Sequence, residues 1–519
     1  MKLIYLLSIS MIGIGSACVM PGNTASVDTS DVIESQQQSL QESQLVKVND
    51  NGKLVYIPDE KGNILPDFSL VGYYGGDVEI PDVKVVKTLY ATGTDADQKL
   101  IEDAIVEVSK QALSKNGFRG AILLKKGLYR VSSTLKIESS GIVIRGEGHT
   151  ENGTRILFTA TKKLPLFRVG GQGSVKEMPN TRVKITDSFV PVGSKSFHVS
   201  SAKGFKVNDK VILYRPGSDQ WIADLKMNQI VERKGTKQWQ ADEYNLMYER
   251  VVTRIEGNKL FIDNPVVMEM EPKYGGGEVY KYEFNGRISN VGIEDLYMES
   301  EYQSDTAENH GWDAISYQKM ENSWVQNVTA KHFGYSCVNL GKETKNISVL
   351  NSNCFEPKSI ITGGRRYSFN NDGQLNLFVN CHATDGRHDF VTGAKVNGPN
   401  VFVDCTAKRT HADIGPHHRW SSGTLYDNIT TDGEINIQDR GQMGSGHGWV
   451  GITQILWNCT VRRAAVQVPY VNGMNYSIGT KGERVPGHFK DRPQGYWEAH
   501  YQTVKPRSLY YAQLKDRKQ

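Results

Sequence analysis

The chain has 519 residues, and its 61 Lys and Arg against 57 Asp and Glu leave a net charge of +4. So small an excess, without a recognisable nucleic-acid-binding motif, argues against nucleic acid as a partner. The chain is too long for one ordinary compact core, which favours an elongated repeat domain that carries an insertion.

The N-terminal residues 1–18 have the pattern of an export signal. Lys2 precedes an apolar stretch, Leu3 to Ile14, and small residues lead from it to Cys18. The stretch is too short to span a bilayer. The pattern resembles a bacterial lipoprotein signal, which implies that Cys18 is lipidated and becomes the first mature residue. The alternative is an ordinary secretory signal, and either one implies export.

A lipoprotein signal implies an outer-membrane protein on the periplasmic side or at the cell surface. No later segment is long and apolar enough for a membrane helix, so we expect the lipid to be the only membrane attachment. The chain from Val19 to Gln44 is rich in Ser, Gln, Asp and Thr and poor in large apolar residues. This composition predicts a flexible tether over residues 19–50.

Residues 95–116 predict a helix, with Asp95 as its N-cap and Asn116 and Gly117 as its stop. Its apolar residues recur at three- and four-residue spacing. They are Ile101, Ala104, Ile105, Val108 and Ala112. Short β-branched runs follow, separated by Gly and Ser, and these predict strands with tight turns.

The helix and the sequence GAILLKKGLYRVSSTLKIESSGIVIRGEG (120–148) resemble the start of the pectate-lyase-like β-helix superfamily. The resemblance implies an all-β, right-handed parallel β-helix whose end is plugged by the helix, since its core and strand edges would otherwise be exposed. We place this cap and the first coils at 85–180. Residues 181–280 break the rhythm and predict a small inserted β-module, to which we assign no chemistry. The main β-helix with the active-site groove follows at 281–480, and 481–519 form a C-terminal cap or tail.

An internal repeat in the second half ends in cysteines. Cys354, Cys381, Cys405 and Cys459 follow Asn or Asp and are spaced by 27, 24 and 54 residues. Because equivalent positions stack in a solenoid, the repeat predicts a ladder of buried sulfur side chains beside polar side chains at a bend. One cysteine per coil matches neither a zinc site nor a disulfide framework, so we expect these residues and Cys337 to be small buried hydrophobes.

Histidine and arginine are concentrated in a short part of the chain. Six of the twelve histidines and four arginines lie within residues 382–447, and Arg365 and Arg366 lie one coil earlier. They occupy the segments GGRRYSF (363–369), DGRHDF (385–390), KRTHADIGPHHRW (408–420) and DRGQMGSGHGW (439–449). Successive coils are about 4.8 Å apart, so these segments are expected to line one groove. Arginine binds carboxylates and sulfates, and histidine transfers protons near neutral pH, although any one of these residues alone suits a solvated surface equally well.

Several motifs here are similar to those of secreted bacterial proteins of the pectate-lyase superfamily. They are GGRRYSF, DGQLN, DGRHDF, GPHHRW, SGHGW and PRSLYYAQL. The similarity covers most of residues 95–515 and implies a lyase that acts on pectate, alginate, or chondroitin or dermatan. A glycosaminoglycan lyase is the nearest relative that the resemblance implies, with an acidic polysaccharide as partner and a monomeric enzyme.

A uronate lyase removes the C5 proton and expels the 4-O-linked sugar, which requires that the charge of the carboxylate be neutralised. We assign the catalytic roles to His388 and His418 as candidate bases, Tyr367 as candidate acid, and Arg366 as carboxylate ligand. The substrate-binding candidates are Arg365, Arg387, His411, His417, Arg419, Trp420, Arg440 and His447. Trp420, Trp449 and Tyr426 suit sugar stacking and a core role equally.

Three alternatives remain open. A calcium ion at Asp385, Asp389 and Asp413 is possible, but we expect no obligatory metal or other cofactor. A glycoside hydrolase would use paired carboxylates, for which Asp404 and Asp439 are further candidates, but surrounding Arg and His make a protonated general acid harder to maintain. A non-catalytic glycan-binding protein would use the same groove, but binding an anion does not require histidine.

Overall fold

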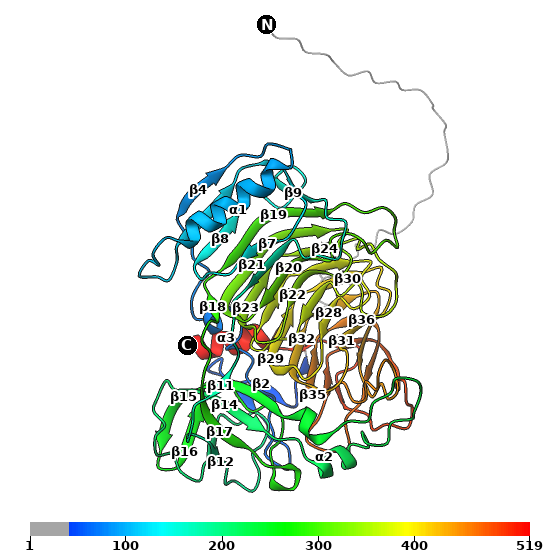
Figure 1. The fold of residues 1–519 in the computed structure, drawn as a ribbon. Coiled ribbons are helices and arrows are strands. Elements are labelled where there is room, and N and C mark those ends of the chain that lie inside the picture. Colours follow the sequence, from blue (N-terminus) through cyan, green and yellow to red (C-terminus); the bar gives the residue numbers. More distant parts are fainter. Residues whose placement is uncertain (1–40) are drawn as a thin grey trace, which may run out of the picture. The chain divides into compact units, whose positions relative to one another are not determined.

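A computed structural model describes residues 41–519 (Figure 1). The predicted export signal, Cys18 and residues 19–40 of the predicted tether lie outside the described residues. The described part is dominated by parallel strands that stack in three ladders, and these ladders are the faces of a parallel β-helix. None of the helices in residues 41–519 has the length and apolar character needed to cross a membrane.

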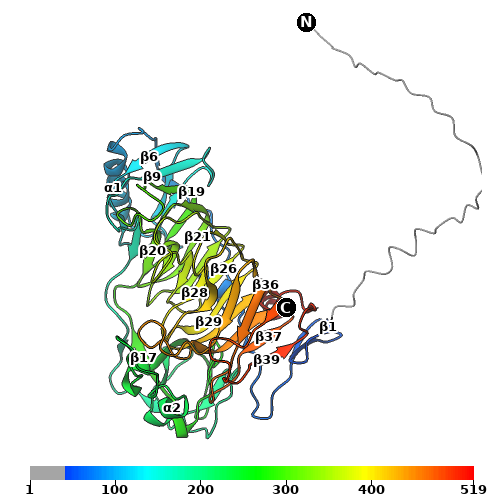
Figure 2. The same ribbon diagram turned by 90° about the vertical axis from the view of Figure 1, so that its right-hand side faces the viewer.

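The three faces follow one another along each coil, so that each strand pairs with the equivalent strand of the next coil (Figure 2). Face one contains β4 (Val85–Leu89), β5 (Gly120–Leu124), β8 (Ile142–Arg145), β18 (Ile288–Ser289), β19 (Gly292–Ser300), β21 (Met320–Lys331), β23 (Lys345–Leu350), β26 (Leu377–Val379), β29 (Asn397–Val403), β32 (Ser421–Asp427), β35 (Gly451–Trp457), β37 (Tyr476–Ile478) and β39 (Tyr496–Glu498). Face two contains β6 (Gly127–Val131), β9 (Thr154–Phe158), the second halves of β19 and β21, β24 (Asn353–Phe355), β27 (His382–Thr384), β30 (Thr406–Lys408), β33 (Thr430–Thr431), β36 (Thr460–Val466) and β38 (Lys481–Arg484). Face three contains β7 (Leu135–Ile137), β10 (Phe167–Gly170), β20 (Asp313–Gln318), β22 (Ser336–Leu340), β25 (Phe369–Asn371), β28 (Phe390–Thr392), β31 (Asp413–Pro416), β34 (Glu434–Ile437) and the second half of β36.

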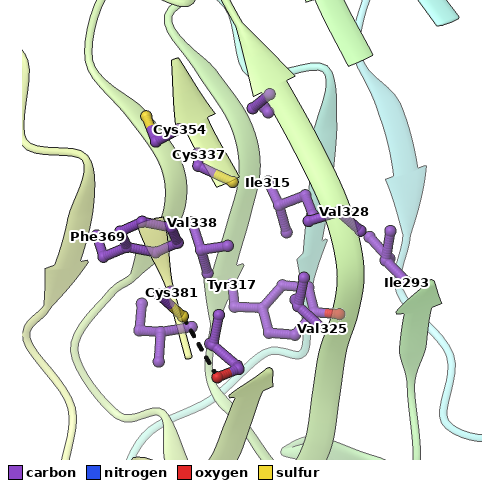
Figure 3. Packing of buried hydrophobic residues seen from close by; sticks show 14 of the residues in the cluster. Ile293, Ile315, Tyr317, Val325, Val328, Cys337, Val338, Cys354, Phe369 and Cys381 are labelled. Atoms are coloured by element: carbon purple, nitrogen blue, oxygen red, sulfur yellow. Dashed lines mark hydrogen bonds between the residues drawn. The ribbon is translucent and has the colours of Figure 1, made fainter. Parts of the chain in front are cut away.

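The interior between the faces is filled by apolar side chains from every coil. Figure 3 shows Cys337 and Cys354 in this interior beside Val338 and Phe369. Aromatic rings also stack from coil to coil, as in Phe378 and Phe402, whose centroids are 4.5 Å apart. Burial of this apolar surface is the main favourable contribution to the stability of the coils.

The five cysteines of the described chain are buried and free of disulfides. The register of the strands corrects the predicted ladder, because Cys354 lies opposite Ala383 and not opposite Cys381. Cys381, Cys405 and Cys459 do share one column, since the residues that follow them are paired from coil to coil. Burial raises the pKa of Cys459 to about 12, so its thiol stays protonated and packs as a small hydrophobe.

Polar residues stack at the bend beside this column. Asn351 donates its side-chain amide to the amide oxygen of Asn327 at 3.2 Å, and Asn380 donates to Asn351 at 2.9 Å. Asn327, Asn351, Asn380, Asp404, Asn428 and Asn458 all have φ between 49° and 55°. Asn and Asp tolerate this left-handed conformation better than other side chains do, which explains their recurrence at the bend.

The helix α1 (Ala96–Ser109) closes the N-terminal end of the interior, where its apolar side chains join those of the first coils (Figure 1). It ends earlier than the predicted residue 116. Asp95 is the N-cap residue, but its side chain makes no capping hydrogen bond. The buried Asp97 instead accepts hydrogen bonds from the backbone and hydroxyl of Thr92, both at 2.8 Å.

The N-terminal segment corrects the predicted extent of the tether. β1 (Gln41–Glu42) pairs with β40 (Val504–Lys505), and β2 (Val46–Val48) pairs with β3 (Leu54–Tyr56). Val46 is fully buried against the outer side of face one. Residues 41–50 are therefore part of the folded domain, because their few apolar side chains are buried in tertiary contacts that composition does not reveal.

The C-terminal boundary is also corrected. β38 and β39 continue the coils beyond residue 480. The final helix α3 (Leu509–Lys518) packs Leu509 and Tyr510 against the outer side of face one, so it covers a side of the β-helix and not its end.

The inserted module is a seven-stranded antiparallel sheet, and its hydrophobic core also includes Trp420, Trp449, Ile452 and Val468 of the coils. Its strands are β11 (Lys176–Glu177), β12 (Val183–Lys184), β13 (Ser196–His198), β14 (Lys210–Arg215), β15 (Leu246–Glu256), β16 (Lys259–Ile262) and β17 (Glu278–Glu283). It also contains α2 (Asp219–Asp224) and the short 3-10 helices η3 (Ala241–Tyr244) and η4 (Pro272–Tyr274), while η2 (Tyr73–Gly76) lies in the N-terminal segment. The predicted fold class, a parallel β-helix with a capping helix and an inserted β-module, is thus confirmed.

Candidate active site

An open pocket of about 580 Å³ lies where four consecutive coils of face three meet the inserted module. It is lined by Arg233 of the module and by Gly363, Gly364, Tyr367, Arg387, His417, His418, Arg440, Met443, Gly444, Ser445 and His447 of the coils. Tyr367 and Arg387 precede β25 and β28, whereas the other coil side chains follow β31 and β34. The strand pairing therefore brings residues from distant parts of the sequence into one pocket.

The parallel register explains how Tyr367 meets His388. Phe369 of β25 lies opposite Phe390 of β28, so the residues two positions before each of them lie side by side. The rings of Tyr367 and His388 have centroids 4.9 Å apart and cross at 86°. Aromatic rings prefer such edge-to-face packing, so the two side chains hold each other in place.

His417 is at the centre of a group of rings. Its centroid lies 5.4 Å from that of Tyr367, 4.4 Å from His388, 5.3 Å from His418 and 5.2 Å from His447. The backbone N–H of His417 donates to the carbonyl of Thr392 in the previous coil at 2.8 Å, which extends the pairing of β28 and β31 by one residue. The imidazoles of His388, His418 and His447 and the phenol of Tyr367 are therefore all within contact distance of His417.

His388 is oriented by Asp413. Its Nδ1 donates to the backbone carbonyl of Asp413 at 2.6 Å and lies 3.3 Å from a carboxylate oxygen of the same residue. The other carboxylate oxygen pairs with Arg440. In the neutral ring Nε2 must then be the unprotonated nitrogen, and it is buried without a partner in residues 41–519. His388 is 2% exposed and lies behind the residues that line the pocket.

The histidines of the pocket are held in their neutral form. Burial lowers the pKa of His418 to about 4 and that of His447 to about 3, and neighbouring arginines add to both effects. Burial also moves the pKa of His417 far below its usual range, and His388 and Arg440 lower it further. At neutral pH these imidazoles are therefore unprotonated.

The phenol of Tyr367 has the opposite role. Burial raises its pKa, and the nearby Arg387 and Arg440 oppose that rise. The hydroxyl is therefore protonated at neutral pH, while the two cations stabilise the phenolate that would remain after proton donation.

The charge of the pocket is positive and only partly balanced. Arg440 is paired with Asp413, whose pKa is held far below its usual range because Arg440 and His388 outweigh the effect of burial. Arg387 donates to the carbonyl of Gly363, and neither it nor Arg233 is paired with a carboxylate of residues 41–519. Within the described chain no Asp or Glu lines the pocket. The arrangement suits an anionic ligand.

Six of the twelve predicted site residues line the pocket together. They are Tyr367, Arg387, His417, His418, Arg440 and His447. His388 lies directly behind them. Arg419 donates to the carbonyl and hydroxyl of Ser445 at 2.9 and 2.8 Å, so it supports the wall of the pocket and does not line it.

The prediction that Arg366 neutralises a substrate carboxylate is not supported by its position. Its guanidinium donates to the backbone carbonyls of Ser359, Asp385 and Asp305, with the closest contact at 2.5 Å. Arg366 is buried, so these carbonyls would be unsatisfied without it. Its role in the described chain is structural.

Arg365, His411 and Trp420 also lie outside the pocket. Arg365 is paired with Glu308 at 2.6 Å. His411 is exposed and precedes β31, whereas His417 and His418 follow that strand. Trp420 is fully buried against the inserted module, where its ring meets that of Trp221 at a centroid distance of 4.9 Å. A sugar cannot reach this ring. The sequence did not predict the module as a partner for Trp420.

Trp449 and Tyr426, which suited stacking or core roles equally, are both buried core residues. The carboxylates considered for calcium are also separated. Asp385 is paired with Arg409, Asp389 accepts a hydrogen bond from Ser368, and Asp413 is paired with Arg440. No group of three possible metal ligands occurs in residues 41–519.

Two features of the site were not predicted. Asp413 was considered only as a cation ligand or hydrolase carboxylate, whereas it orients His388. Arg233 was not considered because it lies in the module, far from the histidine-rich segments. Its only sequence signal is a short basic turn, Arg233 to Lys237, which by itself suits any solvated loop.

No family model and no curated protein matches this sequence. Among solved structures, the tailspike protein gp49 of Pseudomonas phage LKA1 is 16% identical over 70% of this chain and 61% of its own, with a TM-score of 0.39. The alginate lyase of Paenibacillus sp. str. FPU-7 is 9% identical over 80% and 98%, with a TM-score of 0.38. The polygalacturonase of Erwinia carotovora ssp. carotovora is 11% identical over 82% and 98%, with a TM-score of 0.35. The chain thus spans less than two thirds of the tailspike, and its own strand pairing shows a parallel β-helix fold.

Proposed function

We propose that the protein is a polysaccharide lyase that cleaves an acidic, uronate-containing polysaccharide by β-elimination. The observation that carries this proposal is the composition of the pocket, which combines guanidinium groups, neutral imidazoles and a protonated phenol, and which no carboxylate of the described chain lines. Hydrolysis of a glycosidic bond normally requires two carboxylates at the bond, so elimination suits this set of residues better.

Three kinds of group are needed for elimination, and each has a candidate in the pocket. Arg387 and Arg440 bind the uronate carboxylate and reduce its charge, which makes the C5 proton more acidic. A neutral imidazole removes that proton. We assign this step to His417, because it lines the pocket beside Tyr367, whereas His388 lies behind the lining. Tyr367 donates its proton to the departing O4.

The proposed step balances in atoms and charge. The C5–H bond and the C4–O4 bond break, and the electron pair of the C5–H bond forms the C4–C5 double bond. His417 gains one proton and Tyr367 loses one, and exchange with water restores both. Asp413 orients His388, whose ring supports both Tyr367 and His417.

The finer parts of the proposal come from the sequence. A glycosaminoglycan such as chondroitin or dermatan sulfate is the favoured substrate on the resemblance of the motifs. Export and anchoring through Cys18, at the periplasmic side or the cell surface, are supported by the signal-like pattern of residues 1–18. We further propose a monomeric enzyme without an obligatory metal.

The test is ultraviolet absorbance of the purified protein, without residues 1–18, incubated with a panel of uronate polysaccharides. The panel contains chondroitin and dermatan sulfates, hyaluronan, heparin, alginate and pectate, each with and without a chelator. We expect the absorbance of an unsaturated uronate to rise with at least one substrate and to be unaffected by the chelator. New reducing ends without this absorbance would mean hydrolysis and would overturn the proposal.

A further inference from the structure

The inserted module supplies part of the pocket wall. Its segment between α2 and η3 lies along the loop that follows β34. The backbone N–H of Lys237 donates to the carbonyl of Ser445 at 3.1 Å, and the indole N–H of Trp239 donates to the carbonyl of Gly446 at 3.3 Å. The guanidinium of Arg233 donates to the carbonyl of Gly444 at 2.9 Å. Three successive carbonyls of the coil loop are therefore bound by the module.

Close packing fixes the module segment between α2 and η3 against the coil loop that follows β34. Gly446 has φ of 87°, and a Cβ atom there would lie 2.6 Å from the carbonyl oxygen of Lys237. Trp239 is buried, and its ring crosses that of Trp420 at 88° with centroids 6.5 Å apart. The backbone N–H of Trp449 also contacts the sulfur of Met227. The position of Arg233 at the pocket is thus set by a buried interface, although its side chain is exposed.

Arg233 brings a charge that the structure leaves unbalanced. It is exposed, it lines the pocket, and no carboxylate of the described residues pairs with it. Arg440 differs, because Asp413 balances its charge. With Arg387 also unpaired by a carboxylate, the pocket has more positive charge than a single uronate carboxylate neutralises.

We propose that Arg233 is a specificity-determining residue that binds a second anionic group of the substrate, on a sugar next to the uronate that is cleaved. This inference rests on the proposed function and deepens it, since it makes the substrate a polysaccharide with a charge on adjacent sugars. The second group is either a sulfate ester or another carboxylate, because the guanidinium fork matches both. The module, to which the sequence assigned no chemistry, then selects the substrate.

The test compares Arg233→Ala with Lys234→Ala, which removes an equal charge from the neighbouring exposed residue outside the pocket lining. The substrates are chondroitin sulfate, with sulfate beside the uronate, alginate, with a carboxylate on every sugar, and unsulfated chondroitin, with uronate on alternate sugars only. Cleavage is measured as kcat/KM and binding by calorimetric titration of each polysaccharide.

For Arg233→Ala we expect a loss of about tenfold or more in binding and in kcat/KM on chondroitin sulfate or on alginate, and less than about threefold on unsulfated chondroitin. A loss on chondroitin sulfate alone identifies sulfate as the second group, and a loss on alginate alone identifies carboxylate. Lys234→Ala should change none of these values by more than about twofold, and Arg233→Lys should recover part of the loss.

An equal loss of Arg233→Ala on all three substrates, or a loss on none, would overturn the inference. If the wild-type protein binds these polysaccharides but forms no unsaturated uronate, the elimination fails while the titrations still decide the role of Arg233. If it binds none of these three, the inference about Arg233 is wrong, while the wider panel of polysaccharides still decides the elimination.

Discussion

Two clusters of charged residues flank the inserted module, and they differ in how their charges are satisfied. The junction cluster consists of Glu249 and Arg287, with Glu321 and Lys345 of the coils. Arg287 lies 2.7 Å from Glu249, and Lys345 lies 3.2 Å from Glu249 and 3.4 Å from Glu321. Burial alone would raise the pKa of Glu249, but Lys345 and Arg287 outweigh it and keep the carboxylate ionised.

The pocket leaves its polar groups available. The imidazole nitrogens Nε2 of His388 and Nδ1 of His417 are buried without partners in residues 41–519, and Arg233 and Arg387 donate only to backbone carbonyls there. In the junction cluster every charge faces an opposite charge of the same protein. A high density of charged residues is therefore not by itself a sign of function. Unbalanced charge and unpaired imidazoles are what indicate a site for a ligand.

The largest expected effect comes from removing the proton-transfer groups of the pocket. We expect His417→Gln and Tyr367→Phe each to lower kcat by about 10²- to 10⁴-fold, because general acid–base groups contribute factors of that size. Ultraviolet assays on the best substrate measure this loss, and thermal unfolding checks that both variants fold. His198→Gln, an exposed histidine of the module, is the control. Activity of His417→Gln within tenfold of wild type would remove His417 as the base.

Breaking the ion pair of Asp413 should affect stability as well as turnover. Asp413→Asn leaves Arg440 without its buried counter-charge and removes the negative charge that lies 3.3 Å from Nδ1 of His388. We therefore expect the free energy of unfolding to fall by about 3 kcal/mol or more. The matched variant is Asp385→Asn, whose partner Arg409 is largely exposed, and it should cost less than about 1 kcal/mol. Equal losses in urea denaturation of the two variants would contradict the distinction between the two pairs.

The junction cluster should contribute to stability without contributing to chemistry. Lys345→Met leaves Glu249 and Glu321 with fewer counter-charges, and we expect a loss of about 2–3 kcal/mol in unfolding free energy with kcat unchanged. Lys210→Met is the control, because Lys210 pairs with the same Glu321 from an exposed position and should change stability by less than about 1 kcal/mol. A drop in kcat for Lys345→Met would show that the two clusters are linked.

The smallest effect is a dependence of stability on pH. The folded protein holds the pKa of His418 at about 4, below the usual value of about 6.5 for an unfolded chain. The unfolded state therefore binds the proton first, and this contribution to stability is present above pH 6.5 and is lost as the pH falls towards 4. We expect the melting temperature of the wild type to fall more over this range than that of His418→Gln. If the melting temperatures of the two proteins fall equally with pH, His418 is not neutral in the folded protein.

The repeated parts of the fold were predictable because they obey a period. The buried cysteines, the polar bend and the capping helix all follow from the spacing of apolar and Asn or Asp residues along one chain segment. The register of one coil was not predictable, since Cys354 and Cys381 are two positions out of step although both follow Asn. A repeat in the sequence identifies a coil, but it does not show at which bend of that coil residues are inserted or deleted.

The sequence by itself determined the short strands, the repeat of the coils and the concentration of histidine and arginine in consecutive coils, because these depend on spacing and composition. The fold class came from the resemblance of its motifs to β-helix proteins. Only the tertiary structure decided which of these side chains share a pocket. Arg366 and Tyr367 are neighbours in the sequence, yet one is bound to buried carbonyls and the other lines the pocket. Arg233 is distant in sequence and completes the wall. Neighbouring residues of a bend can point to different sides, and an insertion can fold back onto the coils, so contact depends on packing in three dimensions and not on distance along the chain.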